Sequence, residues 1–428
     1  MPGAKKNRNP WAWIPSLYVA EGLPYALAMS VSVVLYKNLG VSNAKIALYT
    51  SWLYLPWVIK PLWSPVVDIL KTRRQWIWAM QFLLGALLAG VALMIPAPHF
   101  FQLTLAFFWL LAFSSATHDI AADGFYMLAT TEHEQSFFSG IRNTAYRIAT
   151  ILAQGELVIL AGKIHDRTGD FSFAWEIAFA LVAGIIFCVG LYHFLVLPKP
   201  ENDQPKNFTS SGNFLAEFLK TFETFFQKPK IIALLSFLLL YRLGEAQLVK
   251  MVQPFLLDPR SQGGLGLEDG QVGLIYGTIG VGALMFGGLL GGFFVSRNGL
   301  KFWLWPMLLA IHLPDAVFIW LAYAQPQNLF AIGAGVAIEQ FGYGFGFTAF
   351  MLYMIYIARG EHRTAHYAIC TGFMALGMML PGMGSGWLQE HLGYQKFFVW
   401  VILATIPSFI VALKIPLDAG FGKRARAN

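Results

Sequence analysis

The sequence predicts an all-α membrane protein with twelve transmembrane helices arranged in two pseudo-symmetric six-helix bundles. Composition is the first reason, because 57% of the 428 residues are hydrophobic and only 12% are charged, whereas soluble domains average about 25% charged residues. The second reason is a series of apolar runs, each near the roughly 20 residues that cross a bilayer as a helix. The third is a polar stretch that separates the first six runs from the last six.

Each apolar run is expected to be a helix, because a segment inside lipid has to satisfy its own backbone hydrogen bonds. The runs of the first half lie near residues 11–36, 45–67, 76–95, 101–129, 138–162 and 174–196. Those of the second half lie near residues 231–257, 271–295, 302–323, 328–357, 364–388 and 397–416. Cys188 and Cys370 fall inside such runs, which predicts buried thiols and no disulfide framework.

A linker divides the chain into three predicted parts: a bundle over 1–197, a cytoplasmic linker over 198–229 and a bundle over 230–428. The linker begins with polar residues, after which Asn213 can cap a helix with phenylalanine and leucine on one face. Such a helix is suited to the membrane interface. Its simplest role is that of a connector that hides its apolar face.

Positive charge predicts the orientation of the chain. Most of the 30 lysines and arginines, Arg142 among them, lie on the flanks and loops that share a side with both termini, and cytoplasmic loops are enriched in these residues. Both termini are therefore expected in the cytoplasm. The net charge of +7 then matches the anionic inner leaflet, and no nucleic-acid partner is expected.

Five carboxylates lie inside apolar runs: Glu21 in the first, Asp119 and Asp123 in the fourth, Glu245 in the seventh and Glu339 in the tenth. A carboxylate at the bilayer centre costs about 3 kcal/mol on insertion scales, so an intramembrane acid points to a functional site. This pattern predicts a protein that moves a solute across a membrane.

Proton coupling is the predicted role of four of these acids. Asp119 and Asp123 are four residues apart and share one helix face, where two carboxyl groups can titrate as a coupled pair. The alternative for this pair is an ion pair with Arg147 on the following run. Glu339 has no cation in its own run, which makes it a proton site. Glu21 is a candidate for either proton or substrate binding.

Substrate binding is the predicted role of Arg147, Arg242, Glu245 and Lys60. Guanidinium and ammonium groups attract carboxylates or phosphates on a solute. Arg242 also lies three residues before Glu245, a spacing that predicts an ion pair on one helix face. Lys60 lies toward the cytoplasmic end of the second run, so its long side chain could instead extend to the interface. Asp315, which also lies in or near the membrane, receives no role.

Two loops, after the second and eighth runs, share a pattern. The first contains Ser64-Pro-Val-Val-Asp68 with Arg73 and Arg74, and the second contains Arg297 shortly after Gly292. Both resemble, in degraded form, the loop signature small-x-x-x-Asp-Arg-x-Gly-Arg-Arg of the major facilitator superfamily (MFS). The resemblance implies a cytoplasmic gate of Asp68, Arg73, Arg74 and Arg297. The alternative is that these positive charges anchor the topology.

A closer resemblance is spread over most of the chain. The motifs Lys60-Pro-Leu-Trp-Ser-Pro-Val-Val-Asp68, His118-Asp-Ile-Ala-Ala-Asp-Gly124 and Tyr241-Arg-Leu-Gly-Glu245 look like those of the AmpG-type muropeptide permeases, within the peptide and acetyl-coenzyme A transporter group. One departure concerns the fourth run, where Gly124-Phe-Tyr-Met-Leu128 replaces the family's Ala-Trp-Lys-Thr-Asp. That difference bears on the substrate and not on the fold.

The resemblance implies an MFS fold in which helices one, four, seven and ten line a central cavity. It further implies a proton-driven importer of anhydro-muropeptides, which are products of cell-wall recycling, in the inner membrane of a bacterium. The expected partners are a muropeptide-like solute, protons and the lipid bilayer. The expected state is a monomer without cofactor or metal.

Two other functions remain open from the sequence. One is an MFS transporter of another solute, such as an acetyl-coenzyme A-like molecule, a peptide, a sugar or a drug. The other is a polytopic membrane enzyme, in which His118, Asp119 and Asp123 would bind a metal ion. The second requires further aspartates on a neighbouring helix, and the fifth run lacks them.

Overall fold

The computed structural model describes residues 9–130, 132–201, 203–204, 211–360 and 363–422. Within these ranges every regular element is a helix, as the sequence predicts. The first half comprises η1 (Pro10–Ala12), α1 (Ile14–Ala26), η2 (Leu27–Val31), α2 (Ser32–Asn38), α3 (Asn43–Trp52), α4 (Leu55–Leu70), α5 (Arg73–Met94), α6 (Phe100–Ala129), α7 (Glu132–Ile151), η3 (Leu152–Leu157), α8 (Val158–Thr168) and α9 (Phe171–Val196).

The linker contains α10 (Ser211–Phe226), at the place where the sequence predicts an amphipathic helix. The second half comprises α11 (Ile231–Leu240), α12 (Leu243–Leu257), η5 (Arg260–Gln262), α13 (Asp269–Val272), η6 (Gly273–Gly280), α14 (Val281–Asn298), α15 (Leu300–His312), η7 (Leu313–Asp315), α16 (Ala316–Ala324), α17 (Leu329–Ile357), α18 (Arg363–Leu403) and α19 (Ile406–Lys414).

Nine helical stretches of the described residues are long and apolar enough to cross a membrane. One of them, Ala365–Lys414, contains two helices, because the backbone of Gly393 breaks the helix with φ 70° and ψ 163°. The α3–α4 pair and α17 account for the two remaining apolar runs. The described helices therefore follow the twelve predicted spans.

Contacts divide the chain into two compact units. The first unit contains Met1–Val31 and Leu62–Gly212, and the second contains Ser32–Pro61 and Asn213–Asn428. Residues 32–61 thus pack with the second half of the chain, although they belong to the first half by sequence. The predicted division into 1–197, 198–229 and 230–428 remains a prediction.

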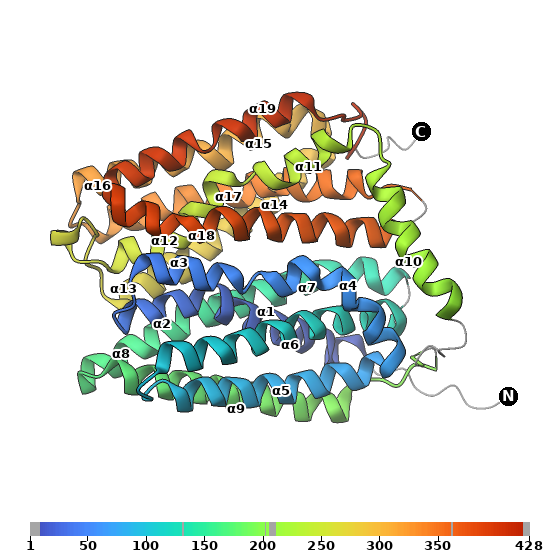
Figure 1. Ribbon diagram of the computed structural model, residues 1–428, viewed down its shortest axis with the longest axis horizontal. Helices are drawn as coiled ribbons and strands as arrows, with labels where there is room; N and C mark the ends of the chain where they lie inside the picture. Colours follow the sequence, from blue (N-terminus) through green and yellow to red (C-terminus); the bar gives the residue numbers. More distant parts are fainter. Residues whose placement is uncertain (1–8, 131, 202, 205–210, 361–362, 423–428) are drawn as a thin grey trace. The chain divides into compact units, whose positions relative to one another are not determined.

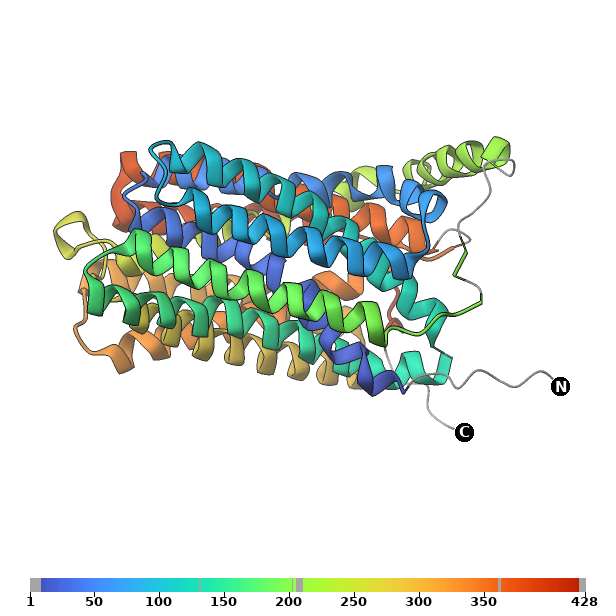
Figure 2. The same cartoon turned by 90° about the horizontal axis from the view of Figure 1, so that it is seen from below.

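In the first unit, α5 packs against both α6 and α9, and α1 packs against α7 (Figure 1). Seen from below, α8 and α9 run side by side (Figure 2). Gly22 allows the close approach of α1 to α7, because a Cβ atom there would lie 2.9 Å from the carbonyl oxygen of Tyr146. This approach places Glu21, the residue before Gly22, close to α7.

In the second unit, glycines let α17 pack closely against α14 and α15 (Figure 1). A Cβ atom on Gly344 would lie 2.0 Å from the carbonyl oxygen of Leu284 on α14. One on Gly342 would lie 2.1 Å from the carbonyl oxygen of Ala310 on α15. Glu339 lies one turn before these glycines, so the same packing holds its side chain against the neighbouring helices.

Helix α18 contacts residues 32–61 in the same way. A Cβ atom on Gly386 would lie 2.0 Å from the carbonyl oxygen of Asn43 at the start of α3, and one on Gly382 would lie 2.8 Å from the hydroxyl oxygen of Ser51. Because the two glycines have no side chain to separate the helices, α3 and α18 form one tightly packed pair.

Candidate functional site

The first unit contains a cluster of acids around one arginine. The guanidinium of Arg142 on α7 forms an ion pair with Asp123 on α6, and the hydroxyl of Tyr18 donates a hydrogen bond of 3.2 Å to the same carboxylate. The Arg142 Cζ atom lies 4.2 Å from the ring centroid of Tyr18 and 4.3 Å from that of Tyr126. The two rings and the carboxylate together compensate the arginine charge.

Glu21 joins this cluster from α1. Its side chain is 8% exposed and lies beside Asp119 on α6. A hydrogen bond between two carboxyl groups requires one of them to carry a proton, because an ionised carboxylate is an acceptor only. Glu21 and Asp119 can therefore hold one proton between them, beside the Asp123–Arg142 ion pair.

The predicted ion pair with Arg147 is not formed. Arg142 is the ionic partner of Asp123, and Arg147 makes no ion pair among the described residues. The sequence placed Arg142 in a cytoplasmic flank, whereas α7 begins at Glu132 and carries Arg142 within the helix. Five residues are about 1.4 helical turns, so Arg147 points away from the Arg142 face. A substrate-binding role for Arg147 remains a prediction.

The second unit contains a different cluster, made of Glu245 on α12, Asp315 on η7 and Glu339 on α17. One carboxylate oxygen from each lies within 4.8 Å of the other two, and none of the three side chains is more than 1% exposed. Glu339 accepts a hydrogen bond of 3.0 Å from the Gln340 amide. Neither oxygen of Glu245 or Asp315 has a hydrogen-bond partner within the described residues.

The predicted Arg242–Glu245 ion pair is wrong. The Arg242 guanidinium donates to the hydroxyl of Tyr343 and lies 4.7 Å from the ring centroid of Phe347. The spacing rule fails because Arg242 is not in a regular helix: it caps α12 with φ −113° and ψ 24°, after the break that follows α11. Three residues across a break do not share a helix face.

A lysine that the sequence left without a role is also buried in the second unit. Lys250 on α12 is 2% exposed; its Nζ atom donates to the Thr50 hydroxyl over 2.9 Å and lies 5.3 Å from the ring centroid of Tyr54. A lysine in the middle of an apolar run is the signal that could have found it. Lys60, the predicted lysine, is partly buried on α4.

A polar network ties residues 32–61 to α12 and α18. Lys37 and Asp258 form an ion pair of 2.5 Å. Asn43 donates to Gln389 over 2.7 Å, and the Tyr394 hydroxyl donates to Asp258 over 2.5 Å. Sequence reasoning missed this network because its members are separated by up to several hundred residues and each is an ordinary loop or helix-end residue by itself.

The structure describes only some side chains of the predicted cytoplasmic gate. The side chain of Asp68 lies outside the described residues. Asp203 accepts from the backbone N–H groups of Arg73 over 2.8 Å and of Arg74 over 3.0 Å, so it caps the start of α5. Arg297 is exposed near the end of α14 and forms no ion pair within the described part of the chain. The gate remains a prediction.

Gly124, where the chain departs from the AmpG pattern, has a structural explanation. A Cβ atom there would lie 2.3 Å from Nε of Arg73, so the glycine makes room for this side chain against α6. The departure thus accompanies a local arrangement of Arg73, at the start of α5, against the last turns of α6.

The predicted metal ligands do not come together. His118 is 1% exposed and its Nε2 atom lies 2.9 Å from the Gln81 amide nitrogen. Within the described residues, the acidic group with metal-ligand spacing is the Glu245, Asp315 and Glu339 cluster and not His118 with Asp119 and Asp123. The arrangement gives no support to the predicted metal site of His118, Asp119 and Asp123.

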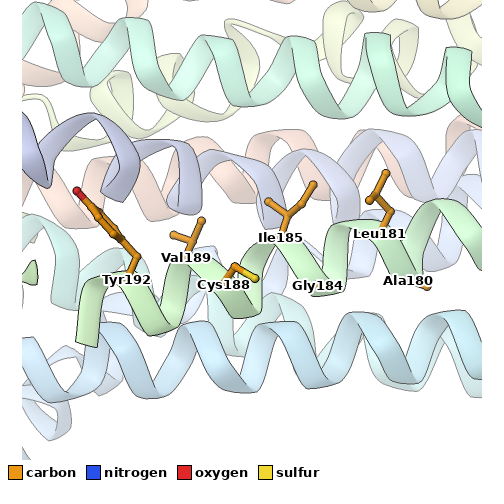
Figure 3. A pocket seen from close by; sticks show the side chains of 7 residues that line it. All are labelled: Ala180, Leu181, Gly184, Ile185, Cys188, Val189 and Tyr192. Carbon is orange, nitrogen blue, oxygen red and sulfur yellow. The ribbon is translucent and has the colours of Figure 1, made fainter. Parts of the chain in front are cut away.

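An open groove of about 570 Å³ runs along the face of α9 shown in Figure 3. Its lining is almost wholly apolar and includes Cys188, which is exposed, while Cys370 is buried. The prediction of a buried Cys188 is therefore wrong, because a run of apolar residues does not show which face of the helix is covered by protein. An apolar face of a membrane helix is suited to lipid contact and not to binding a charged solute.

Apolar helical spans with charged clusters buried inside them are the features of a membrane transporter. The chain belongs to the Major Facilitator Superfamily, whose family model matches residues 16–380. The members of this family that resemble the chain are transporters and not enzymes.

Curated relatives confirm the resemblance to AmpG proteins. The chain is 25% identical over 409 residues to "Putative transporter AmpG 4" of Rickettsia conorii, covering 93% of this chain and 94% of the relative. It is 26% identical over 399 residues to the "Anhydromuropeptide permease" of Escherichia coli K12, covering 92% of this chain and 77% of the relative.

Solved structures agree on the fold. A D-xylose–proton symporter superposes with a TM-score of 0.68 at 12% identity, covering 95% of this chain and 97% of the symporter. The nucleoside transporter NupG superposes with a TM-score of 0.66 at 15% identity, covering 95% of this chain and 99% of NupG. The predicted MFS fold is confirmed.

Proposed function

We propose that this protein imports anhydro-muropeptides together with protons, by alternating access across a bacterial inner membrane. The observation that carries the proposal is the similarity to an anhydromuropeptide permease over 92% of the chain, combined with buried acids in both units. In this proposal both termini are cytoplasmic and the monomer is the working unit.

Protons would bind at the acids that the bilayer and the protein shield from water. In the first unit, the neighbouring carboxyl groups of Glu21 and Asp119 would share a proton, and Asp123 would exchange its pairing with Arg142 for a proton. In the second unit, Glu339 lies beside two other carboxylates. Protonation removes the penalty of moving these charges through a low-dielectric interior.

Arg242 is the strongest candidate for contact with the cargo. Muropeptides carry carboxylates on their peptide, and a guanidinium binds a carboxylate with charge-assisted hydrogen bonds. The Nε–H of Arg242 is buried and has no acceptor within the described residues, so it has a donor to offer. The rings of Tyr343 and Phe347 lie against the same guanidinium and can stack on a sugar face. Arg147, Glu245 and Lys60 would complete the substrate contacts.

Alternating access requires contacts that break. The Lys37–Asp258 ion pair and the Asn43–Gln389 hydrogen bond hold residues 32–61 against α12 and α18, so both would separate when this segment moves. The loop residues Asp68, Arg73, Arg74 and Arg297 would act as the gate on the cytoplasmic side. A rocking movement would form the contacts of residues 32–61 while it breaks those of the gate residues, and the reverse movement would do the opposite.

The direct test is uptake of a labelled anhydro-disaccharide tetrapeptide into proteoliposomes under an imposed pH gradient. We expect accumulation that a protonophore abolishes, and loss of most uptake in Arg242→Gln. Glu156→Gln, which alters an exposed acid on η3, is the matched control and should transport normally. Gradient-driven uptake of an acyl-coenzyme A or a simple sugar, with none of the muropeptide, would contradict the substrate assignment.

A further inference from the structure

Asp315 is a buried acid to which neither the sequence motifs nor the comparisons give a role. It ends η7, a short turn between α15 and α16, and it is 1% exposed. Its two carboxylate oxygens have no hydrogen-bond partner among the described residues. One of them lies within 4.8 Å of carboxylate oxygens from both Glu245 and Glu339.

The backbone around Asp315 explains why the side chain reaches the two glutamates. Pro314 has no N–H, so it interrupts the hydrogen-bonding of α15 and the chain turns before α16 begins. Gly342 lets α17 approach the backbone of α15 at Ala310. These two features bring the aspartate and Glu339 together from helices that regular side-chain packing would hold further apart.

Among the residues that the structure describes, no positively charged side chain forms an ion pair with any of the three carboxylates. The guanidinium of Arg242 is bound to Tyr343 and stacked on Phe347, and it forms no ion pair with any of the three acids. Counting Arg242 as the nearest cation still leaves two negative charges in a buried site. Buried charges without partners are strongly unfavourable, and such groups take up protons instead.

The other polar groups around the cluster do not supply the missing charge. Tyr276 on η6 and Gln340 and Tyr343 on α17 are neutral groups near the glutamates. The ring of His312 lies 6.1 Å from that of Tyr241 and 5.7 Å from that of Phe409. This histidine therefore contacts aromatic rings and has no hydrogen-bond partner among the described residues.

We propose that Glu245, Asp315 and Glu339 form one shared proton site that binds two protons, with Asp315 linking the two glutamates. Two bound protons would leave one negative charge among the three carboxyl groups, which removes most of the cost of burying three like charges together. This proposal deepens the proposed function, because it assigns the protons of transport in the second unit to three acids acting as a unit and moves Glu245 from substrate binding to proton binding.

The test is a pH titration of the purified full-length protein by infrared difference spectroscopy, which detects protonated carboxyl groups without any transported solute. We expect Asp315→Asn to remove one protonated carboxyl signal and to displace the titration midpoint of the remaining one by about one pH unit or more, the mark of coupled acids. Asp315→Glu, which restores a carboxyl group, should restore both signals. The exposed control Glu156→Gln should leave the buried signals unchanged.

Three results would overturn the proposal. The first is an Asp315→Asn spectrum in which both glutamates titrate as they do in the unaltered protein. The second is a set of spectra in which each substitution removes the signal of its own acid and leaves the titration midpoints of the other two acids unchanged. The third is saturable binding of Na⁺, Mg²⁺ or Ca²⁺ that depends on Asp315, measured by calorimetry, because it would make the cluster a metal site. If Asp315→Asn does not fold, Asp315→Glu and Glu245→Gln give the same comparison.

Transport distinguishes this proposal from the broader one. In proteoliposomes, Asp315→Asn should reduce gradient-driven accumulation by about tenfold or more while solute exchange at equal pH continues. If the unaltered protein transports no muropeptide, the proposed substrate fails, but the spectroscopic titration still decides whether the three acids share protons.

Discussion

The two units contain similar acids and neutralise them by different means. In the first unit, Asp123 pairs with Arg142, which also lies on the rings of Tyr18 and Tyr126. In the second unit, Glu245 and Asp315 have no hydrogen-bond partner within the described residues, and the nearest arginine is turned to a tyrosine. Acidic residues thus form an ion pair in one unit and a cluster without an ion-pair partner among the described residues in the other.

This difference teaches that the position of an arginine on its helix decides what a nearby acid can do. Arg142 lies inside the continuous helix α7 and faces α6. Arg242 lies at a helix break and faces α17. An acid with a fixed cation can release it only by a movement of side chains or helices, whereas an acid without one is compensated by protons.

The largest expected effect comes from Gly344→Ala, which would disturb the second cluster through its scaffold. The added Cβ atom would lie 2.0 Å from the Leu284 carbonyl oxygen, so α14 and α17 would have to separate. Overpacking of this kind costs about 3 kcal/mol, measured by unfolding in denaturant. Gly282→Ala on α14, where a Cβ atom meets no atom within 4 Å, is the control and should be neutral or slightly stabilising.

Arg142→Met tests the compensation in the first unit. It removes the ion pair with Asp123 and the contacts with two tyrosine rings. Because the two side chains are 26% and 42% exposed, the loss is smaller than for a fully buried pair, at about 2 kcal/mol. Thermal unfolding of the detergent-solubilised protein measures it. Arg142→Lys should recover part of the loss, and equal stability of the Met and Lys variants would show that charge is unimportant here.

Matched neutral substitutions should change the free energy of unfolding in opposite directions in the two clusters. Asp123→Asn removes the partner of Arg142 and should destabilise the protein. Asp315→Asn removes an uncompensated buried carboxyl group and should stabilise it by about 1 kcal/mol, as for other buried charges replaced by neutral groups of similar size. Chemical unfolding at one pH compares the two, and changes of the same sign would contradict the contrast between the units.

The smallest expected effect concerns the network that joins residues 32–61 to α12 and α18. Lys37→Met and Asp258→Asn each remove one partner of an ion pair of 2.5 Å. The coupling energy between the two residues in a double-mutant cycle should be about 1 kcal/mol. It stays this small because Asp258 keeps a second partner, the hydroxyl of Tyr394. Additive effects of the two substitutions would show that the pair does not hold the segment.

Much of the fold could be predicted from the sequence because membrane insertion imposes a simple rule on composition. The twelve apolar runs, the linker helix and the departure at Gly124 are all local features of the chain. Helix breaks were harder to predict. The break at Arg242 changed the direction of its side chain and made a three-residue spacing misleading.

The candidate site was predicted only in part. An acid inside an apolar run is visible by itself, which is why Glu21, Asp119, Asp123, Glu245 and Glu339 were found. The partner of an acid is not visible, because it depends on which helices pack together and on how each is rotated. Arg142 was therefore assigned to a flank, Arg147 was considered in its place, and Asp315 and Lys250 received no role.

By itself, the sequence determined that the chain is an all-helical membrane protein of the MFS type with acids in its interior, because lipid tolerates apolar helices and few charges. The tertiary structure alone decided which acids are compensated. Glycine contacts, the Pro314 turn and the break at Arg242 set helix approach and rotation. Such long-range geometry fixes the distances between charges, and those distances determine whether an ion pair or protons neutralise each acid.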